Sequence, residues 1–346
     1  MGLPKSSKAP RVSVLMPCRD TAATLDEAVE SIRQQTLADL ELVAVDDGSA
    51  DGTAVRLDRW AEVDPRLRVL HRPHGGLIDS LNAGLAECRA PLIARMDADD
   101  RSHPDRLASQ AALLAAQPDL AAVGCLVEAF PPEDIGPGLA LYLEWQNSLT
   151  TPEAIAREIY VESPFAHPSV TMRAEWVRRV GGYHDRGWPE DYDLWLRLHA
   201  AGGRFAKVPQ VLFSWREHAG RLTHGDPRYA IDRFLQAKVF YLSRGPLHGR
   251  QSLIVWGAGI VGKRLSRLLL AEGLPLIAFV DIDPAKIGRT RRGLPVIGPD
   301  EFMAWWLRSP RPVLLAAVGA RGARALVRQQ INAFGLVEGQ DWWAVA

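Results

Sequence analysis

Short apolar runs alternate with longer amphipathic segments along the N-terminal third of the chain. The runs have the length of strands and lie at residues 11–16, 41–45, 67–70 and 90–94. Between the first two, Leu25, Ala28, Val29 and Ile32 recur at the three- and four-residue spacing of an amphipathic helix. Strands that alternate with helices form a mostly parallel sheet covered by helices on both faces. The sequence therefore predicts an α/β fold.

The fourth apolar run leads into Arg95-Met96-Asp97-Ala98-Asp99-Asp100, which gathers three carboxylates in one short loop. Because neighbouring carboxylates repel each other, a fold that holds them together needs a compensating charge. Oxygen ligands suit Mn2+ or Mg2+, and such an ion also binds diphosphate oxygens. The alternative is a solvated acidic loop. A position at the carboxyl end of a strand favours the metal site, since open α/β sheets bind ligands at that edge.

Polar residues also follow the first two apolar runs, at Pro17–Asp20 and at Asp46–Ser49. The loops after parallel strands emerge at one edge of the sheet, so we expect both segments to lie beside the acidic loop. Asp46 and Asp47 would accept hydrogen bonds from a base or a ribose there. Their alternative role is to form an Asp-Gly turn.

Charge is distributed unevenly along the 346 residues, although the formal net charge is zero. Residues 1–249 contain 28 Lys and Arg against 34 Asp and Glu, whereas residues 250–346 contain 13 against 7. The asymmetry predicts two domains, which we place at residues 1–243 and 250–346, and an anionic ligand for the second.

Cysteine usage and hydropathy predict a cytoplasmic protein. The three cysteines have no metal-like spacing, which is typical of a reducing compartment. No apolar run reaches about 18 residues, and the first ten residues do not read as a signal peptide.

Several short motifs together resemble family 2 glycosyltransferases with the GT-A fold, over roughly residues 10–225. They are Val12–Pro17, Val45–Ser49, Leu81–Gly84, Arg95–Asp100, His167–Ser169, Gly181–Tyr183, Glu190–Asp191 and Trp215–His218. The resemblance implies an inverting, metal-dependent hexosyltransferase that uses a nucleotide-diphosphate sugar. It also implies a role in the synthesis of a cell-surface polysaccharide or glycan.

The resemblance assigns roles to particular residues. Pro17 and Asp46 or Asp47 would contact the nucleotide, and Asp97 and Asp99 would hold the metal and the ribose. We expect His218 to contact the metal or the diphosphate. His167 is a weaker candidate for the same role, because a single histidine is more often a structural hydrogen-bonding residue.

Asp191 would be the general base for the acceptor hydroxyl, according to the same resemblance. Glu190, Asp191 and Asp193 begin an amphipathic helix, where acids also complement the helix dipole, so helix capping is the alternative reading. Three acids are more than capping needs, which favours the catalytic role of Asp191.

The C-terminal part contains Gly257-Ala-Gly259-Ile-Val-Gly262 between a predicted strand and a predicted helix, and a second strand ends at Asp281. Glycines let a backbone approach a diphosphate at a helix N-terminus, and the acid would face a ribose. Residues 250–346 resemble the small Rossmann-like domains of bacterial sugar acyltransferases and redox-sensing repressors. The nucleotide would be a regulator or a docked substrate. The alternative is a domain that binds nothing and serves assembly.

The expected partners are a nucleotide-diphosphate sugar donor and a glycan or lipid-linked acceptor, and no nucleic acid. Peripheral membrane association and a homo-oligomer are left open. The alternative function is a nucleotide-sensing, regulatory protein with a catalytically inactive transferase domain. The intact acids Asp97, Asp99 and Asp191 argue against that alternative. A nucleotidyl transferase would need a glycine-rich, basic loop after the first strand, and Pro17–Asp20 is not one.

Overall fold

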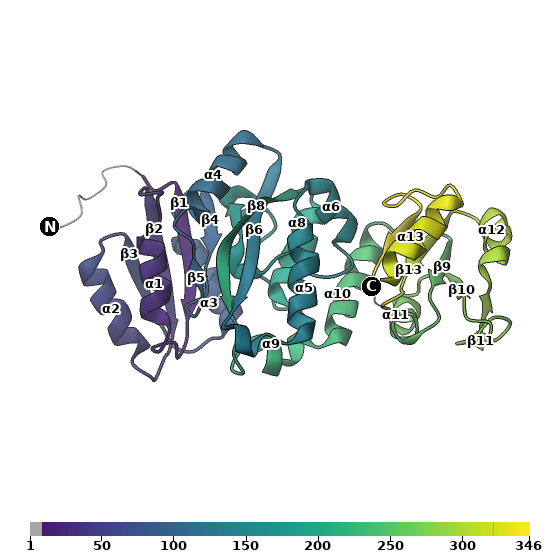
Figure 1. The fold of residues 1–346 in the computed structure, drawn as a ribbon, viewed down its shortest axis with the longest axis horizontal. Coiled ribbons are helices and arrows are strands. Elements are labelled where there is room, and N and C mark those ends of the chain that lie inside the picture. The colour runs from purple at the N-terminus through teal and green to yellow at the C-terminus, as the bar shows by residue number, and fades with distance from the viewer. Residues whose placement is uncertain (1–8, 321) are drawn as a thin grey trace. The chain divides into compact units, whose positions relative to one another are not determined.

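The computed structural model describes residues 9–320 and 322–346, which form two compact units (Figure 1). Unit 1 contains the chain up to Ala156 together with Pro164–Arg186 and Asp193–Gly225. Unit 2 contains Arg157–Ser163, Gly187–Tyr192 and Asp226–Ala346. Residues 1–8, which belong to the first predicted domain and to the segment unlike a signal peptide, lie outside the described residues.

The division between the units differs from the predicted boundary near residue 243. Helix α10 (Ile231–Arg244), which we had assigned to the first domain, belongs to unit 2 and packs against α11 (Ile260–Ala271). The segment Arg157–Ser163 also belongs to unit 2, where buried Glu158 forms ion pairs with Arg324 and Arg328. Sequence spacing could not show these contacts, because each joins residues that are far apart in the chain.

Unit 1 is built around one sheet. Its elements are β1 (Val12–Cys18), α1 (Leu25–Arg33), β2 (Leu40–Asp47), α2 (Thr53–Val63), β3 (Leu67–Arg72), α3 (Leu77–Glu87), β4 (Leu92–Arg95), β5 (Arg101–Ser102), α4 (Arg106–Ala116), β6 (Leu120–Phe130), η1 (Pro132–Asp134), α5 (Pro137–Ser148), η2 (His167–Ser169), β7 (Thr171–Arg173), α7 (Ala174–Arg179), β8 (Arg204–Arg216) and α9 (Leu222–Gly225). Helices α6 (Pro152–Glu158) and α8 (Glu190–Ala200) contribute residues to both units.

The strand order in this sheet is β3-β2-β1-β4-β7-β6-β8-β5. Strand β1 pairs in parallel with β2 and β4, and β2 pairs in parallel with β3. Beyond β4, β7 is antiparallel to both of its neighbours. The predicted α/β fold with a mostly parallel sheet is therefore confirmed for the first four strands, and their carboxyl ends meet at one edge.

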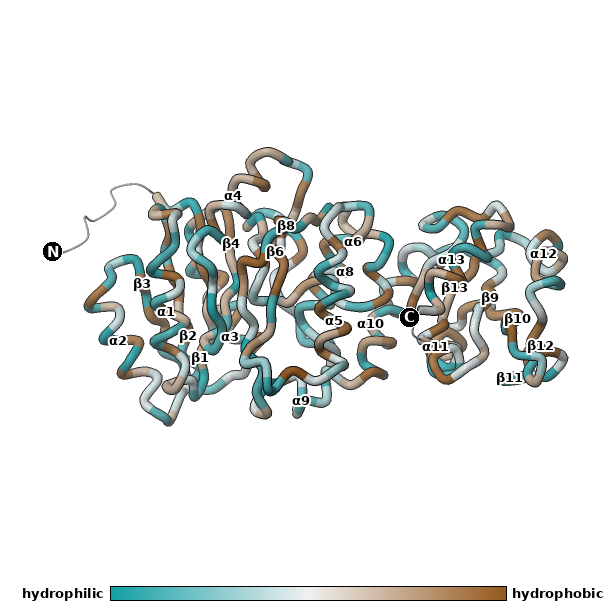
Figure 2. Tube along the Cα trace, viewed as in Figure 1, coloured by the Kyte–Doolittle hydropathy of each residue, from teal (hydrophilic) through white to brown (hydrophobic). Residues whose placement is uncertain are grey.

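Buried residues explain why these segments form their elements. Every residue of β1 and β2 is buried, as expected for strands covered on both faces. Helix α1 buries the four apolar residues Leu25, Ala28, Val29 and Ile32, and it lies in front of the sheet in Figure 1. The hydropathy of the helices α1 and α2 alternates between teal and brown in Figure 2, because only one face of each helix meets the sheet.

Unit 2 contains a smaller, mostly parallel sheet in the order β11-β12-β10-β9-β13-β14. Its further elements are η3 (Pro227–Tyr229), β9 (Ser252–Trp256), β10 (Leu276–Val280), β11 (Thr290–Arg291), β12 (Leu294–Ile297), α12 (Pro299–Arg308), β13 (Pro312–Ala316), α13 (Ala323–Ala333) and β14 (Trp342–Ala344). Buried Trp256 and Phe302 pack edge to face in its core. The strand order reverses at β9, as at the switch point of a doubly wound sheet. The resemblance of this unit to Rossmann-like domains stays a prediction.

Among the described residues, we find no helix with both the length and the hydropathy that crossing a membrane requires.

Candidate active site

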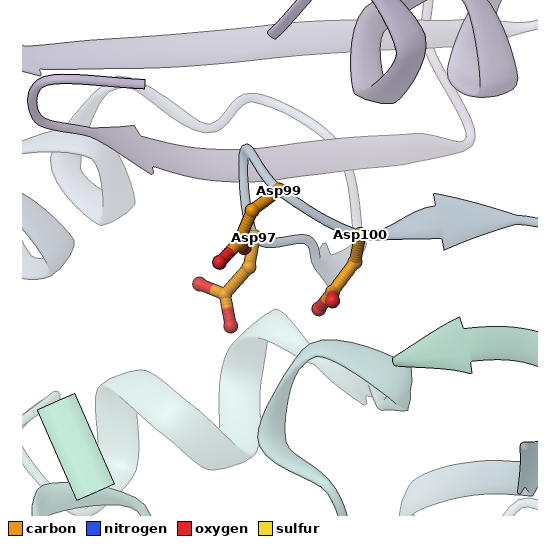
Figure 3. Close-up of side chains that lie close together, drawn as sticks. All are labelled: Asp97, Asp99 and Asp100. Atoms are coloured by element: carbon orange, nitrogen blue, oxygen red, sulfur yellow. The ribbon is translucent and has the colours of Figure 1, made fainter. Parts of the chain in front are cut away.

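Three carboxylates of unit 1 gather in the loop between β4 and β5. Oxygen atoms of Asp97, Asp99 and Asp100 all lie within 4.8 Å of one another. Figure 3 shows the three side chains pointing to the same side of the loop. The sequence indicated all three acids, but it assigned only Asp97 and Asp99 to the metal. The structure adds Asp100 to the group.

Two buried arginines supply positive charge beneath this acidic loop. Nη2 of Arg95 donates to Oδ1 of Asp97 at 2.6 Å. Nη1 of Arg106 donates to the carbonyl oxygen of Arg95 at 3.1 Å and to that of Pro168 at 2.6 Å. Both arginine side chains are almost fully buried. They therefore provide part of the compensating charge that the repulsion between the acids requires.

Residues at and after the end of strand β8 also contact the acidic loop. The backbone N–H of Arg216 donates to Oδ1 of Asp100 at 2.7 Å, and Nε of Arg216 donates to the carbonyl oxygen of Asp99 at 2.6 Å. Nε2 of His218 lies 2.9 Å from Oδ2 of Asp99. The structure thus brings His218 to the acidic loop, where the sequence analysis expected it.

The acidic loop has unusual proton affinity. Burial, followed by the charge of Asp97, raises the pKa of Asp99. Burial and the charges of Asp99 and Asp97 raise the pKa of Asp100 well above its usual range. Oδ2 of Asp100 is buried and has no hydrogen-bond partner. An oxygen-rich donor set with one unsatisfied buried oxygen is chemically suited to a divalent cation.

Asp46 and Asp47 lie at the end of β2, and both are buried. The carboxylate of Asp47 accepts the backbone N–H groups of Gly75 and Gly76 at 2.7 and 3.0 Å. Asp46 accepts the backbone N–H of Ser49 at 3.1 Å, which is the turn contact that we weighed as the alternative to nucleotide binding. Contact of either acid with a nucleotide stays a prediction.

Two histidines that the sequence analysis missed face these acids. Nδ1 of His71 lies 3.1 Å from Asp46, and Nδ1 of His74 lies 2.8 Å from Asp47. Hydrogen bonds that the ring of His71 donates to the carboxylates of Asp58 and Asp46 raise the pKa of His71. The signal that could have found them is their position, because β3 ends beside β2 at the same sheet edge.

The first two loops meet as expected from parallel strands. The backbone N–H of Ala50 donates to Asp20 at 2.8 Å, and that of Asp20 donates to the hydroxyl of Ser49 at 3.0 Å. Pro17 lies inside β1, opposite Val45 of β2. It lies beyond the part of β1 that pairs with β4, so its missing N–H removes no bond on that side.

His167 has a structural role in this fold. The ring is buried, and its Nε2 lies 2.9 Å from the hydroxyl of Tyr183. Asn82 in turn accepts the backbone N–H of Tyr183 at 2.9 Å. Burial, followed by the charge of Arg95, lowers the pKa of His167 well below its usual range, which keeps the ring neutral.

In unit 2, Glu190 and Asp191 form a buried acidic pair at the start of α8. The hydroxyl of Tyr229 donates to Glu190, at 2.9 Å from Oε2. Burial, followed by the charge of Glu190, raises the pKa of Asp191 to about 8. By contrast, Asp193 in unit 1 forms an ion pair with Arg197 at 2.7 Å. Asp191 accepts the backbone N–H of Tyr192 at 2.7 Å, so both the helix-stabilising and the catalytic reading of Asp191 stay predictions.

The glycine loop of unit 2 precedes α11. A Cβ on Gly257 would lie 2.8 Å from the carbonyl oxygen of Ala317, and a Cβ on Gly262 would lie 1.8 Å from that of Gly257. A Cβ on Gly259 would have no atom within 4 Å. Packing thus explains two of the glycines but not Gly259. Asp281 accepts the backbone N–H of Ala258 at 2.8 Å, which ties the end of β10 to this loop.

A family model and two relatives that match this chain are all glycosyltransferases. The family model "Glycosyl transferase family 2" matches residues 13–181. The amylovoran biosynthesis glycosyltransferase AmsE of Erwinia amylovora is 32% identical over 199 residues, which cover 57% of this chain and 72% of the relative. A UDP-Gal:alpha-D-GlcNAc-diphosphoundecaprenol beta-1,3-galactosyltransferase of Escherichia coli is 30% identical over 242 residues, which cover 68% and 85%.

Solved structures share the fold. The mannosyltransferase PcManGT of Pyrobaculum calidifontis, solved with GDP-Man and Mn2+, has a TM-score of 0.52 and 23% identity, and the match covers 78% of this chain and 71% of that one. Residues 1–349 of S. aureus TarS, solved with UDP-GlcNAc, have a TM-score of 0.57 and 16% identity, with coverages of 75% and 71%. At these identities, the two solved structures show that the fold is shared.

The hydrogen bonds of Asp47 predict a measurable effect on stability. Asn at this position keeps one acceptor oxygen and loses the other, so we expect Asp47→Asn to lower the free energy of unfolding by about 1–3 kcal/mol. Chemical denaturation of this variant and of Asp105→Asn, which changes an exposed acid, measures the effect. Equal stability of wild type and Asp47→Asn would contradict a stabilising role of these hydrogen bonds.

The stabilisation by Asp47 should decrease at acidic pH. Burial opposes ionisation of Asp47, but hydrogen bonds from Gly75, His74 and Gly76 outweigh it and lower the pKa. The stabilisation of the fold by ionised Asp47 is therefore complete above the pKa of about 3.9 in the unfolded chain. It is lost as the pH falls through the lower pKa of the folded state. The stability difference between wild type and Asp47→Asn should shrink over that acidic range.

Proposed function

Because the chain belongs to glycosyltransferase family 2, we propose that it transfers a sugar from a nucleotide-diphosphate sugar to an acceptor hydroxyl, with inversion at the anomeric carbon. The observation that carries the proposal is the group of three carboxylates at the carboxyl end of β4. The acceptor would be a glycan or a lipid-linked glycan used for a cell-surface polysaccharide. The names of the relatives, which include a diphosphoundecaprenol-dependent transferase, support this acceptor class.

We further propose that Asp97 and Asp99 hold a divalent cation, Mn2+ or Mg2+, with His218 as a third ligand or a diphosphate contact. Such an ion, when bound, neutralises charge on the leaving diphosphate. The residues of the chain have the complementary task. Arg95 fixes the carboxylate of Asp97 from below, and the end of β8 fixes Asp99 through Arg216. The ligand oxygens are thereby oriented before the donor arrives, which lowers the cost of binding.

Asp191 is our proposed general base. The acceptor oxygen forms a bond to the anomeric carbon while the bond from that carbon to the diphosphate oxygen breaks. The proton of the acceptor hydroxyl passes to the carboxylate of Asp191, and the nucleoside diphosphate leaves with the bonding electrons. A base with a pKa of about 8 retains proton affinity in the neutral range, which suits proton abstraction.

The glycine loop of unit 2 is proposed to receive a nucleotide, as a regulator or docked substrate. The free space at Gly259 and the acid Asp281 at the end of β10 support this role. The carboxylate of Asp281 already accepts N–H groups and pairs with Lys286 at 3.1 Å, so a ribose would have to share it. A cytoplasmic location and a homo-oligomer also stay predictions.

Removal of Asp99 tests the metal site. Asp99→Ala deletes one carboxylate of the acidic loop, so we expect manganese-dependent binding of a nucleotide-diphosphate sugar to disappear while the fold remains. Calorimetry measures binding, and circular dichroism measures the fold. Asp134→Ala removes an exposed acid outside the loop and serves as the control. Unchanged manganese-dependent binding by Asp99→Ala would rule out the proposed ligand.

Replacement of Asp191 separates catalysis from helix stabilisation. Asn supports a helix start about as well as Asp, so a structural role predicts little change for Asp191→Asn. A catalytic base predicts a loss of turnover of about 10²-fold or more, with donor affinity kept. Asp300→Asn, in the first turn of α12, controls for the loss of charge at a helix start. Turnover of Asp191→Asn within a few-fold of wild type would refute the assignment.

The pH profile gives an independent measure of the same base. Only the ionised carboxylate accepts a proton, so turnover of the wild type should rise as the pH increases through about 8. The rise should be absent from the residual activity of Asp191→Asn.

Substitution at Gly259 tests the proposed nucleotide site in unit 2. Gly259→Val places atoms in open space, so we expect the fold to be kept and metal-independent nucleotide binding to be lost. Manganese-dependent donor binding in unit 1 should remain, because it uses other residues. Gly262→Ala is the structural contrast, since its Cβ would collide with the backbone of Gly257 and lower the melting temperature. Calorimetry that detects no metal-independent nucleotide binding by wild type would favour the assembly role.

A further inference from the structure

Helix α11 of unit 2 has one buried face and one exposed, basic face. Gly262, Leu265, Ser266 and Leu269 are buried against the unit. On the opposite face, Ile260 is 75% exposed, and the side chains of Arg264 and Arg267 are 47% and 56% exposed. Lys263 is exposed as well. Figure 2 shows teal and brown segments along α11, which reflect this division. The outer face therefore combines cations with an apolar side chain.

The hairpin of β11 and β12 extends this basic surface. Nη2 of Arg292 donates to the carbonyl oxygen of Lys263 at 3.0 Å, and its Nε donates to the hydroxyl of Ser266 at 3.1 Å. Arg289 and Arg291 lie in the same hairpin segment. We define the basic face as Lys263, Arg264, Arg267 and Arg292. Arg292 joins the hairpin to α11 through these hydrogen bonds, so its side chain lies beside the cations of the helix.

Few acids balance the basic face. Asp232 lies 3.9 Å from Arg264 and 3.2 Å from Arg267. In the described part of the chain, neither Lys263 nor Arg292 has an ion pair with an acid. Arg292 has a φ of 53°, a conformation that residues other than glycine rarely adopt. Gathered like charges repel one another, so a surface of this kind gains stability from an anionic partner.

We propose that the basic face binds the surface of a bilayer that contains anionic lipids. The exposed side chain of Ile260 lies beside Lys263 and Arg264 on the helix, and an interface of head groups and acyl chains accommodates both kinds of side chain. No aromatic residue belongs to the basic face, so it lacks the stacking groups of a single-stranded nucleic acid site. The inference does not rest on the proposed catalytic mechanism, because it uses neither the acidic loop nor Asp191.

Vesicle binding by the full-length protein tests the proposal. We expect the wild type to sediment with vesicles of phosphatidylglycerol and phosphatidylcholine and to remain in solution with vesicles of phosphatidylcholine alone. Each cation near an anionic surface strengthens binding about fivefold, so Lys263→Glu/Arg267→Glu should weaken it at least about twentyfold. Added salt should weaken the binding of the wild type as well. Ile260→Ser should reduce the binding that persists in salt.

Arg308→Glu/Arg311→Glu is the matched control, because it changes the net charge equally at exposed residues outside the basic face. This variant should retain most of the binding. If Lys263→Glu/Arg267→Glu fails to fold, Lys263→Gln/Arg267→Gln repeats the test with a smaller charge change. Equal loss in both reversed variants would show that only net charge matters and would overturn the proposal. Absence of vesicle binding by wild type would also overturn it, as would tighter binding to single-stranded RNA than to anionic vesicles.

Discussion

The hydrogen bond from buried Arg95 to Asp97 is the interaction on which the acidic loop depends. Three carboxylates within 4.8 Å repel one another, and burial increases that repulsion because the local dielectric constant is low. Arg95 binds the first acid, and Arg106 holds the backbone of Arg95 in place. On the opposite side, the hydroxyl of Thr24 donates to the carbonyl oxygen of Ala98 at 3.0 Å. The loop is therefore held by contacts from several elements of unit 1.

Charged side chains are arranged differently in the two units. In unit 1, the carboxylates of Asp46 and Asp47 accept backbone N–H groups at the sheet edge, whereas Asp97, Asp99 and Asp100 gather in the acidic loop. In unit 2, the basic face of α11 and the hairpin has only Asp232 as an ion-pair partner among the described residues. Unit 1 thus contains the gathered carboxylates for which we propose a metal, and unit 2 contains the cations for which we propose anionic lipids.

Glycines illustrate how packing and binding can be separated. In the loop before α11, Gly257 and Gly262 are required because a Cβ would collide with backbone atoms. Gly259 is not required by packing, so its presence has to be explained by another constraint, such as the approach of a ligand. The motif therefore contains two glycines that packing requires and one, Gly259, for which we propose contact with a ligand.

The sequence by itself determined the strands and helices that surround the site, because their buried faces repeat at the spacing of each element. It also indicated Asp97, Asp99 and Asp100, since all three follow one strand. Only the tertiary structure decided which partners these acids have. Arg216 reaches Asp100 across 116 positions of the chain, and His218 reaches Asp99 across 119. The pairing of His71 with Asp46 and the membership of α10 in unit 2 were equally absent from local patterns. Local spacing reports which face of an element is buried, whereas long-range contacts depend on how the whole sheet brings its edges together.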